Sequence, residues 1–272
     1  MTTSPGLRYE PVVITFHPFA SAHFILDQSV LTVTLGCGDK VKATTTWAVV
    51  KHPEGAVVVD TGIHPGAIDD ADSAWGTGEE RIGVPLMERG QEVTAQLARV
   101  GLAPSDVRYV VNTHLHGDHV GGNAELPAAT FVCQRDEYEY ANAPDIPSMV
   151  REYPLDQLAF DTLRYEPIDG DHDLYGDGTI RLLQTPGHTP GHQSVVLRLP
   201  ERGTVILTGD AIWTQANLDE MTLPGIIWFP SAYVKSRRRL LELQATEGGE
   251  WFFTHDPDTF GALGWDEGGA YA

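Results

Sequence analysis

The sequence predicts a single α/β domain that covers residues 1–272. Short apolar runs rich in β-branched residues alternate along the chain with segments of helical periodicity, which is the pattern of an α/β fold. No internal repeat, low-complexity tract or Gly/Ser linker divides the chain. With 42% hydrophobic and 9% aromatic residues, the composition favours one large core and excludes a disordered protein.

Six apolar runs predict buried strands, because each is short and is followed by loop-forming residues. In chain order, these strands cover residues 45–50, 56–59, 108–111, 180–184, 194–199 and 204–207. Three further segments predict helices, at residues 92–100, 136–141 and 232–243. The first of these helices ends at Gly101, a residue type that commonly terminates helices. Residues 64–90, rich in Gly and Asp, predict a long surface loop, which either covers an active site or only connects two elements.

The charge of the chain excludes several kinds of partner. It has 18 Lys and Arg against 38 Asp and Glu, a formal net charge of -20, which opposes binding to nucleic acid or to a membrane surface. Cys37 and Cys133 are too few for a disulfide framework and are predicted to be free thiols. The first residues lack a basic region followed by an apolar core, and no apolar run is long enough to span a bilayer. The predicted location is therefore the cytoplasm.

The candidate functional residues begin with a histidine-rich motif directly after a predicted strand. The sequence His-Leu-His-Gly-Asp-His places four candidate metal ligands within six positions. In an extended segment, His114 and His116 project to the same side and can meet one ion. A turn at the following glycine lets Asp118 and His119 reach a second ion. The spacing predicts two adjacent metal sites, and a polar loop of solvent-facing histidines is the weaker alternative.

Three more candidate ligands lie just beyond other apolar runs, namely His188, Asp210 and His255. Proline and glycine on both sides of His188 predict a tight turn after the strand that ends at residue 184. The ends of buried strands are the usual location of sites in open α/β folds. Each of these residues alone is a weak signal, because a lone His or Asp often only caps or hydrogen-bonds. Together with the first motif, they predict a site for two ions.

These residues resemble the metal motif of the metallo-β-lactamase superfamily, in the same order along nearly the whole chain. The resemblance implies an αββα sandwich and two divalent metal ions. Zinc is the expected metal, and iron, cobalt and manganese remain alternatives because all the ligands are N or O donors. The resemblance assigns one ion to His114, His116 and His188 and the other to Asp118, His119 and His255, with Asp210 bridging them. It also implies that Asp60, in the sequence Asp-Thr-Gly, orients a ligand histidine.

Within the superfamily, the sequence resembles the N-acyl-homoserine lactonases. The similarity lies in residues 25–28 (ILDQ), 186–194 (PGHTPGHQS) and 210–218 (DAIWTQANL). One residue departs from that family: Trp213 stands where the family has a tyrosine whose hydroxyl contacts the lactone carbonyl. An indole can donate one hydrogen bond but cannot accept one. A cysteine at the bridging position would favour a β-lactamase, and an acidic residue at position 116 an iron-dependent oxidoreductase; this chain has neither.

The resemblance implies a quorum-quenching hydrolase that opens the ring of N-acyl-homoserine lactones by attack of a metal-bridging hydroxide on the ester carbonyl. Asp118 is then expected to carry a proton to the leaving alkoxide, and Trp213 to act at the substrate. Apolar residues in the loops would form the wall of the substrate pocket. The candidates are Phe24, Ile25, Trp75, Met87, Trp213, Ile226, Ile227, Trp228 and Phe229. For each of them a place in the core is the stronger alternative, most of all for Ile226 and Ile227, because apolar side chains are usually buried for packing alone.

Several other functions compete with this interpretation. A 4-pyridoxolactonase, or another small ester or thioester hydrolase, would use the same two-metal site. A glyoxalase II type of thioester hydrolase would need groups for the glutathione carboxylates, and a nucleic-acid phosphodiesterase is opposed by the charge of -20. A non-catalytic metal-binding scaffold is the alternative outside enzymes, disfavoured because all seven ligand positions are intact. The expected partner is a small lactone or ester, and a homodimer is left open.

Overall fold

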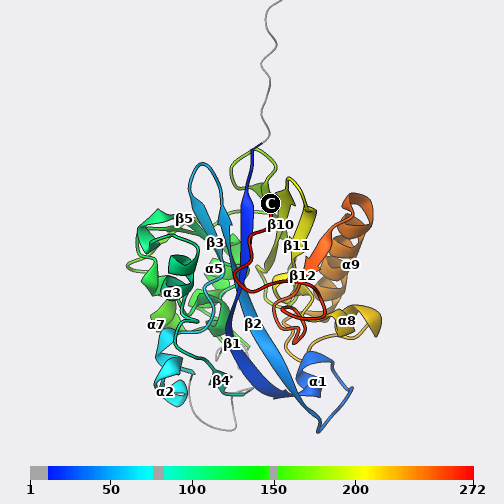
Figure 1. The fold of residues 1–272 in the computed structure, drawn as a ribbon. Coiled ribbons are helices and arrows are strands. Elements are labelled where there is room, and N and C mark those ends of the chain that lie inside the picture. Colours follow the sequence, from blue (N-terminus) through cyan, green and yellow to red (C-terminus); the bar gives the residue numbers. More distant parts are fainter. Residues whose placement is uncertain (1–11, 76–82, 147–151) are drawn as a thin grey trace, which may run out of the picture.

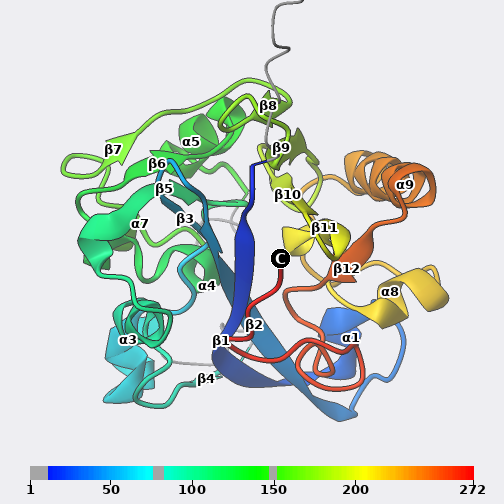
Figure 2. The same ribbon diagram turned by 45° about the horizontal axis from the view of Figure 1, so that its top comes forward.

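The computed structural model describes residues 12–75, 83–146 and 152–272. In these residues, two β-sheets lie face to face between helices (Figure 1; Figure 2). The first sheet has the strand order β4-β1-β2-β3-β5-β6-β7, and the second has the order β12-β11-β10-β9-β8. This is the expected αββα sandwich, and that prediction is confirmed.

The strands have the following bounds. The first sheet contains β1 (Thr15–Asp27), β2 (Lys40–Lys51), β3 (Ala56–Val59), β4 (Pro85–Leu86), β5 (Val107–Val111), β6 (Thr130–Val132) and β7 (Arg164–Tyr165). The second contains β8 (His172–Asp173), β9 (Ile180–Gln184), β10 (Gln193–Leu199), β11 (Gly203–Leu207) and β12 (Glu250–Phe252). Strands β3, β5, β6 and β7 are parallel, as are β11 and β12, so the segments that follow them emerge at shared edges of the sheets.

Helices and short 3-10 turns connect these strands. The α-helices are α1 (Gln28–Leu31), α2 (Ala71–Trp75), α3 (Val93–Arg99), α4 (Gly117–Val120), α5 (Arg135–Asn142), α7 (Leu155–Leu158), α8 (Gln215–Asp219) and α9 (Pro230–Glu247). The 3-10 turns are η1 (Pro65–Ile68), η2 (Pro104–Asp106), η3 (Asn123–Glu125) and η4 (Gly209–Ala211). Within the described ranges, no helix is long and apolar enough to cross a membrane.

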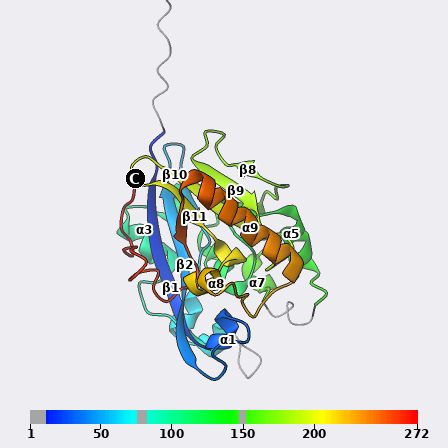
Figure 3. The ribbon, with the colours of Figure 1, turned by 90° about the vertical axis from the view of Figure 1, so that its right-hand side faces the viewer.

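Alternating side chains make both faces of each sheet apolar. In β3, Val57 and Val59 face the second sheet, whereas Val58 packs on the opposite side with the residues of α3. In β10, Val195 likewise joins the core between the sheets, and Val196 joins the outer core beneath α9. Because side chains alternate along a strand, strands covered on both faces appear as continuous apolar runs in the sequence. Helix α9 lies across the outer face of the second sheet (Figure 3).

All six predicted strands and all three predicted helices are present, with ends that differ by a few residues. The longest strand, β1, was not predicted, because Pro18 and two histidines interrupt its apolar pattern. It pairs with β2 from Thr15 beside Lys51 to Asp27 beside Lys40, with a shift in register between Ala20 and Ala22. Both cysteines are free, as predicted.

The prediction of a surface loop at residues 64–90 is wrong for the part that the structure describes. This segment forms η1, α2 and β4, and it buries Ala67 and Met87 in an apolar cluster with β1. The many glycine and aspartate residues lower the average hydrophobicity of this segment. The few apolar side chains that bury it therefore produced no recognisable pattern in the sequence. Residues 76–82 lie outside the described residues.

Candidate metal centre

The predicted ligand residues converge at the ends of strands from both sheets. His114 comes three residues after β5, and His188 lies in the connection between β9 and β10. Asp210 is in η4, directly after β11, and His255 follows β12. The parallel strands of each sheet end at the same edge, and the two edges bring these residues together.

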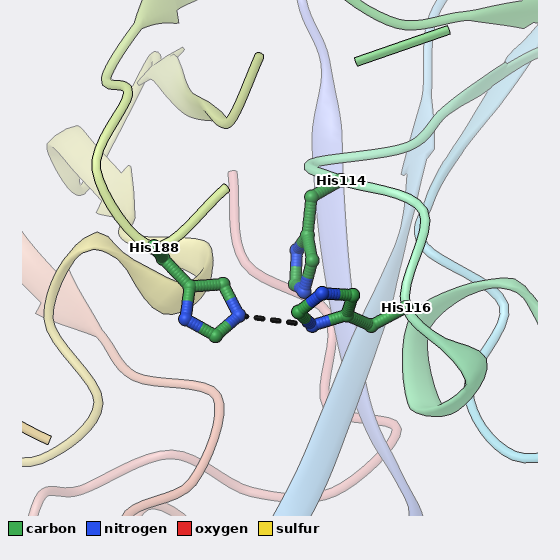
Figure 4. Close-up of side chains that lie close together, drawn as sticks. All are labelled: His114, His116 and His188. Atoms are coloured by element: carbon green, nitrogen blue, oxygen red, sulfur yellow. Dashed lines mark hydrogen bonds between the residues drawn. The ribbon is translucent and has the colours of Figure 1, made fainter. Parts of the chain in front are cut away.

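Three histidines form the first group of candidate ligands. One donor nitrogen each of His114, His116 and His188 lies within 4.8 Å of the other two. Nε2 of His188 is 3.1 Å from Nδ1 of His116, and the three rings surround a common point (Figure 4). All three side chains are buried. The extended backbone after β5 therefore directs His114 and His116 to one side, as their spacing suggested.

The second group consists of Asp118, His119 and His255, whose donor atoms also lie within 4.8 Å of one another. Asp210 lies between the two groups. Its Oδ2 is 3.2 Å from Nε2 of His188 and 3.3 Å from Nε2 of His255, and its Oδ1 is 3.3 Å from Nε2 of His119. One carboxylate thus contacts both groups, which is the position of a bridging ligand.

Hydrogen bonds to the outer ring nitrogens orient three of these histidines. Nδ1 of His188 donates to the carbonyl oxygen of Ile226 at 2.9 Å, and Nδ1 of His255 donates to that of Thr44 at 3.1 Å. Nδ1 of His119 is 2.8 Å from the carboxylate of Asp60. Because a carbonyl only accepts, these bonds fix the proton on Nδ1 and leave the lone pair of Nε2 toward the centre.

Asp60 holds the first motif in place from behind. Its backbone is left-handed, with φ of 58°, and its carboxylate accepts hydrogen bonds from the amide and the hydroxyl of Thr113, both at 2.8 Å. Burial raises the pKa of Asp60 above its ordinary value, although the charge and hydrogen bond of His119 act against this rise. The strained backbone directs the carboxylate of Asp60 at His119 and at the start of the motif.

Replacing Asp60 by asparagine is expected to weaken metal binding by about 10- to 100-fold, because His119 loses its charged partner. Asparagine tolerates the left-handed backbone, so the fold is retained. Competition with a chelator measures the affinity, and the exposed Asp161→Asn substitution is the control. Wild-type affinity in the Asp60→Asn protein would contradict a role in orienting His119.

The electrostatics of the cluster fit a pair of cations. Burial, together with the neighbouring histidines, lowers the pKa of His114 and His116 well below its ordinary value. Burial also acts to lower the pKa of His119, but the carboxylates around it outweigh this and raise that pKa well above its ordinary value. Imidazoles and carboxylates in one buried cluster form the donor set that divalent transition metals bind.

Unpartnered polar atoms support the same interpretation. Among the described residues, Nε2 of His114, Nε2 of His119 and Oδ1 of Asp210 are buried without a hydrogen-bond partner of suitable geometry. A buried polar atom without a partner costs about 1–3 kcal/mol. Metal ions bound at this position would act as partners for these atoms. The residues therefore fit the pair of divalent metal ions that the sequence implied.

A small apolar pocket, with a volume of about 50 Å³, opens above the cluster. Its wall is apolar and its floor carries the candidate ligands. The lining residues are Phe24, Leu26, Val30, Trp75, His116, Asp118, Glu152, His188, Asp210, Trp213, Ile226 and His255. None of the described residues that line it is a lysine or an arginine. The apolar wall therefore suits a substrate with an apolar part.

Four of the nine predicted pocket residues line this wall: Phe24, Trp75, Trp213 and Ile226. The other five candidates, Ile25, Met87, Ile227, Trp228 and Phe229, do not line it. Ile25 is 50% exposed because side chains alternate along β1, so that Phe24 and Leu26 face the pocket instead. Met87 packs in the core, and Phe229 is 52% exposed. The sequence did not reveal Leu26, Val30 or Glu152.

The family of the chain follows from its sequence. The family model described as the metallo-beta-lactamase superfamily matches residues 41–255. The chain belongs to the metallo-β-lactamase superfamily. Membership in this superfamily confirms the resemblance that the ligand motif suggested, and it agrees with the two-sheet fold.

Relatives in the metallo-β-lactamase superfamily include several lactonases. The N-acyl homoserine lactonase AttM of Azorhizobium caulinodans is 34% identical over 229 residues, which cover 83% of this chain and 86% of AttM. The N-acyl homoserine lactonase AiiA of Bacillus thuringiensis subsp. kurstaki is 33% identical over 233 residues, 85% of this chain and 89% of AiiA. A structure of N-acyl homoserine lactone hydrolase, with the product N-hexanoyl-L-homoserine at its catalytic metal centre, has a TM-score of 0.81 at 29% identity. It covers 92% of this chain and 95% of that one.

Proposed function

We propose that this protein is a single-domain, metal-dependent hydrolase that opens the ring of N-acyl-homoserine lactones. The observation that carries the proposal is a cluster of buried imidazoles and carboxylates at the floor of an apolar pocket, with Asp210 in contact with both groups. Similarity to the lactonases of Azorhizobium and Bacillus supports the choice of substrate. Such an activity would quench quorum-sensing signals built on these lactones.

Two divalent ions are expected in the cluster, one held by His114, His116 and His188 and the other by Asp118, His119 and His255, with Asp210 between them. Zinc is the metal we propose, because imidazole-rich sites with carboxylates and an open position are typical of catalytic zinc. When bound, such ions supply an activated water at neutral pH and polarise an ester carbonyl.

The side chains that line the pocket are proposed to bind the substrate. The apolar wall formed by Phe24, Leu26 and Val30 receives the acyl chain and excludes water from it. The lining residues that the structure describes include no lysine or arginine that would pair with the carboxylates of a glutathione thioester. We propose a neutral lactone because the apolar wall matches its acyl chain.

Asp118 is the candidate proton carrier. It lines the pocket, and its side chain is 17% exposed, whereas His119 behind it is fully buried. Its Oδ2 lies 3.6 Å from Nε2 of both His119 and His255, so it borders the cluster and the substrate space at once. A carboxylate at this position can take a proton from the attacking water and deliver it to the ring oxygen as the carbon–oxygen bond breaks.

Trp213 is the candidate contact to the substrate carbonyl. The residue is 4% exposed, lines the pocket, and has its ring centroid 4.7 Å from that of His255. Its Nε1 finds no hydrogen-bond partner within the described part of the chain. A buried N–H without a partner at the pocket wall is available to a ligand oxygen.

The Trp213→Phe variant is expected to lose about 10- to 100-fold in kcat/KM on N-hexanoyl-homoserine lactone, because phenylalanine cannot donate a hydrogen bond. Trp213→Tyr, which restores a donor, is expected to recover part of this loss. Metal content serves as the control and should not change. A Trp213→Phe protein as active as the wild type would contradict the assigned contact.

A panel of substrates tests the proposed specificity. We would measure acid release by the zinc-loaded protein with N-acyl-homoserine lactones of several chain lengths, 4-pyridoxolactone, a glutathione thioester and a β-lactam. Rapid opening of the acyl-homoserine lactones alone is the expected result. If the protein hydrolysed only 4-pyridoxolactone, the thioester or the β-lactam, the assigned substrate would be wrong. If the metal-loaded protein hydrolysed none of the compounds, a non-catalytic metal-binding scaffold would be favoured.

A further inference from the structure

A buried glutamate outside both candidate ligand groups joins the loops that carry the three histidines. Glu137, in α5, is fully buried. Its Oε1 accepts a hydrogen bond from the amide of Leu115 and another from the hydroxyl of Tyr153, both at 3.0 Å. Its Oε2 accepts one from the amide of Gly191, also at 3.0 Å. A single carboxylate thus receives three donors from three separate segments of the chain.

The two amide donors belong to the loops of the three-histidine group. Leu115 stands between His114 and His116, and Gly191 is in the same turn as His188. One loop follows β5 of the first sheet, and the other connects β9 and β10 of the second sheet. Glu137 therefore ties the two segments together, in addition to the backbone hydrogen bond from the amide of Gln193 to the carbonyl oxygen of Thr113.

Close packing around Glu137 indicates that this contact is specific. A Cβ atom on Gly191 would lie 2.1 Å from the backbone nitrogen of Glu137, so only glycine allows α5 to approach the second loop this closely. The ring of Tyr153 lies edge-on against His116, with 5.0 Å between the centroids. The hydroxyl that binds Glu137 therefore belongs to a residue that also packs on a candidate ligand.

A fully buried carboxylate is costly unless it is hydrogen-bonded, and three donors satisfy the carboxylate of Glu137. Burial raises the pKa of Glu137, which is the electrostatic sign of that cost. The second group of ligands does not depend on Glu137, since Asp60 holds His119 and the carbonyl of Thr44 holds His255. In the first group, the carbonyl of Ile226 orients the ring of His188, and Glu137 connects the loop of His188 to that of His114 and His116.

We propose that Glu137 is a positioning residue that sets the spacing of the three-histidine group by clamping the His114–His116 loop to the His188 loop. The inference rests on the proposed metal centre and deepens it, since Glu137 itself contacts neither of the two ligand groups through its carboxylate. Loss of the clamp affects the ion at His114, His116 and His188 more than the ion at Asp118, His119 and His255.

The Glu137→Gln variant tests this proposal, because the amide keeps the shape of the side chain but offers only one acceptor oxygen. Glu139→Gln, on the exposed side of the same helix, is the matched control. Zinc affinity is measured by chelator competition, zinc per chain by elemental analysis, and the melting temperature with and without zinc. We expect Glu137→Gln to bind one of its two zinc ions about 10- to 100-fold more weakly, with a smaller rise in melting temperature on zinc addition.

A purely structural role would lower the melting temperatures of the metal-free and the metal-loaded protein equally and leave both affinities unchanged. That result would overturn the inference without touching the proposed function. A wild-type protein that takes up no zinc would overturn both. Should Glu137→Gln fail to fold, Tyr153→Phe decides. This variant removes one of the three hydrogen-bond donors to Glu137. We expect it to bind the ion at His114, His116 and His188 about two- to tenfold more weakly. An unchanged zinc affinity would contradict the proposed clamp.

Discussion

Replacing Asp210 by asparagine is expected to lower lactone hydrolysis by about 1,000-fold or more and to release metal from the centre. Asp210 is the side chain that contacts residues of both candidate ligand groups, and its Oδ2 lies 3.2 Å from His188 and 3.3 Å from His255. An amide carries no negative charge and presents one oxygen, so it cannot bind two cations as a carboxylate does. The neighbouring imidazoles would then lose the negative charge that Asp210 places between them.

Zinc content by elemental analysis and kcat/KM on one acyl-homoserine lactone, measured on the same preparation, check this prediction. The exposed Asp161→Asn substitution provides the matched control, with both quantities expected at the wild-type level. An Asp210→Asn protein that keeps two zinc ions and full activity would rule out a bridging role for this carboxylate.

The Asp118→Asn variant is expected to lose about 100- to 10,000-fold in kcat while it keeps most of its metal. Asparagine retains an oxygen that can remain near the second group, but it cannot take up and release a proton at neutral pH. Asp118 also lines the pocket, so its effect should fall on turnover more than on the affinity for substrate.

Metal content and kcat, measured over a range of added zinc, separate the two roles of Asp118. A loss of kcat that persists at saturating zinc supports proton transfer. Full recovery of activity by excess zinc would contradict it and would leave Asp118 as a ligand only.

The sequence predicted the parts of the site that depend on local spacing. His114, His116, Asp118 and His119 lie within six positions, and a strand followed by a turn is enough to bring them together. Residues that are distant in the chain, such as His255, were candidate ligands because they follow apolar runs, and only the order of the family motif assigned each of them to an ion. Their convergence depends on how the two sheets pack, which no local pattern encodes.

Features that depend on packing or register escaped prediction. Glu137 lies in the acidic segment Arg-Asp-Glu-Tyr-Glu, where nothing distinguishes it from its exposed neighbour Glu139. Its burial results from the approach of the glycine-containing turn to α5. In the same way, the choice between Ile25 and Leu26 for the pocket wall depends on the register of β1, a strand whose pattern is broken by proline and histidine.

The most direct test of the central claim is a metal titration of the metal-free protein with N-hexanoyl-homoserine lactone as substrate. Ring opening is followed by acid release as zinc is added, and bound zinc is measured in parallel. Activity is expected to be absent without metal, to rise with zinc and to saturate at about two ions per chain. Equal turnover by the metal-free protein would contradict metal-dependent lactone hydrolysis at this site.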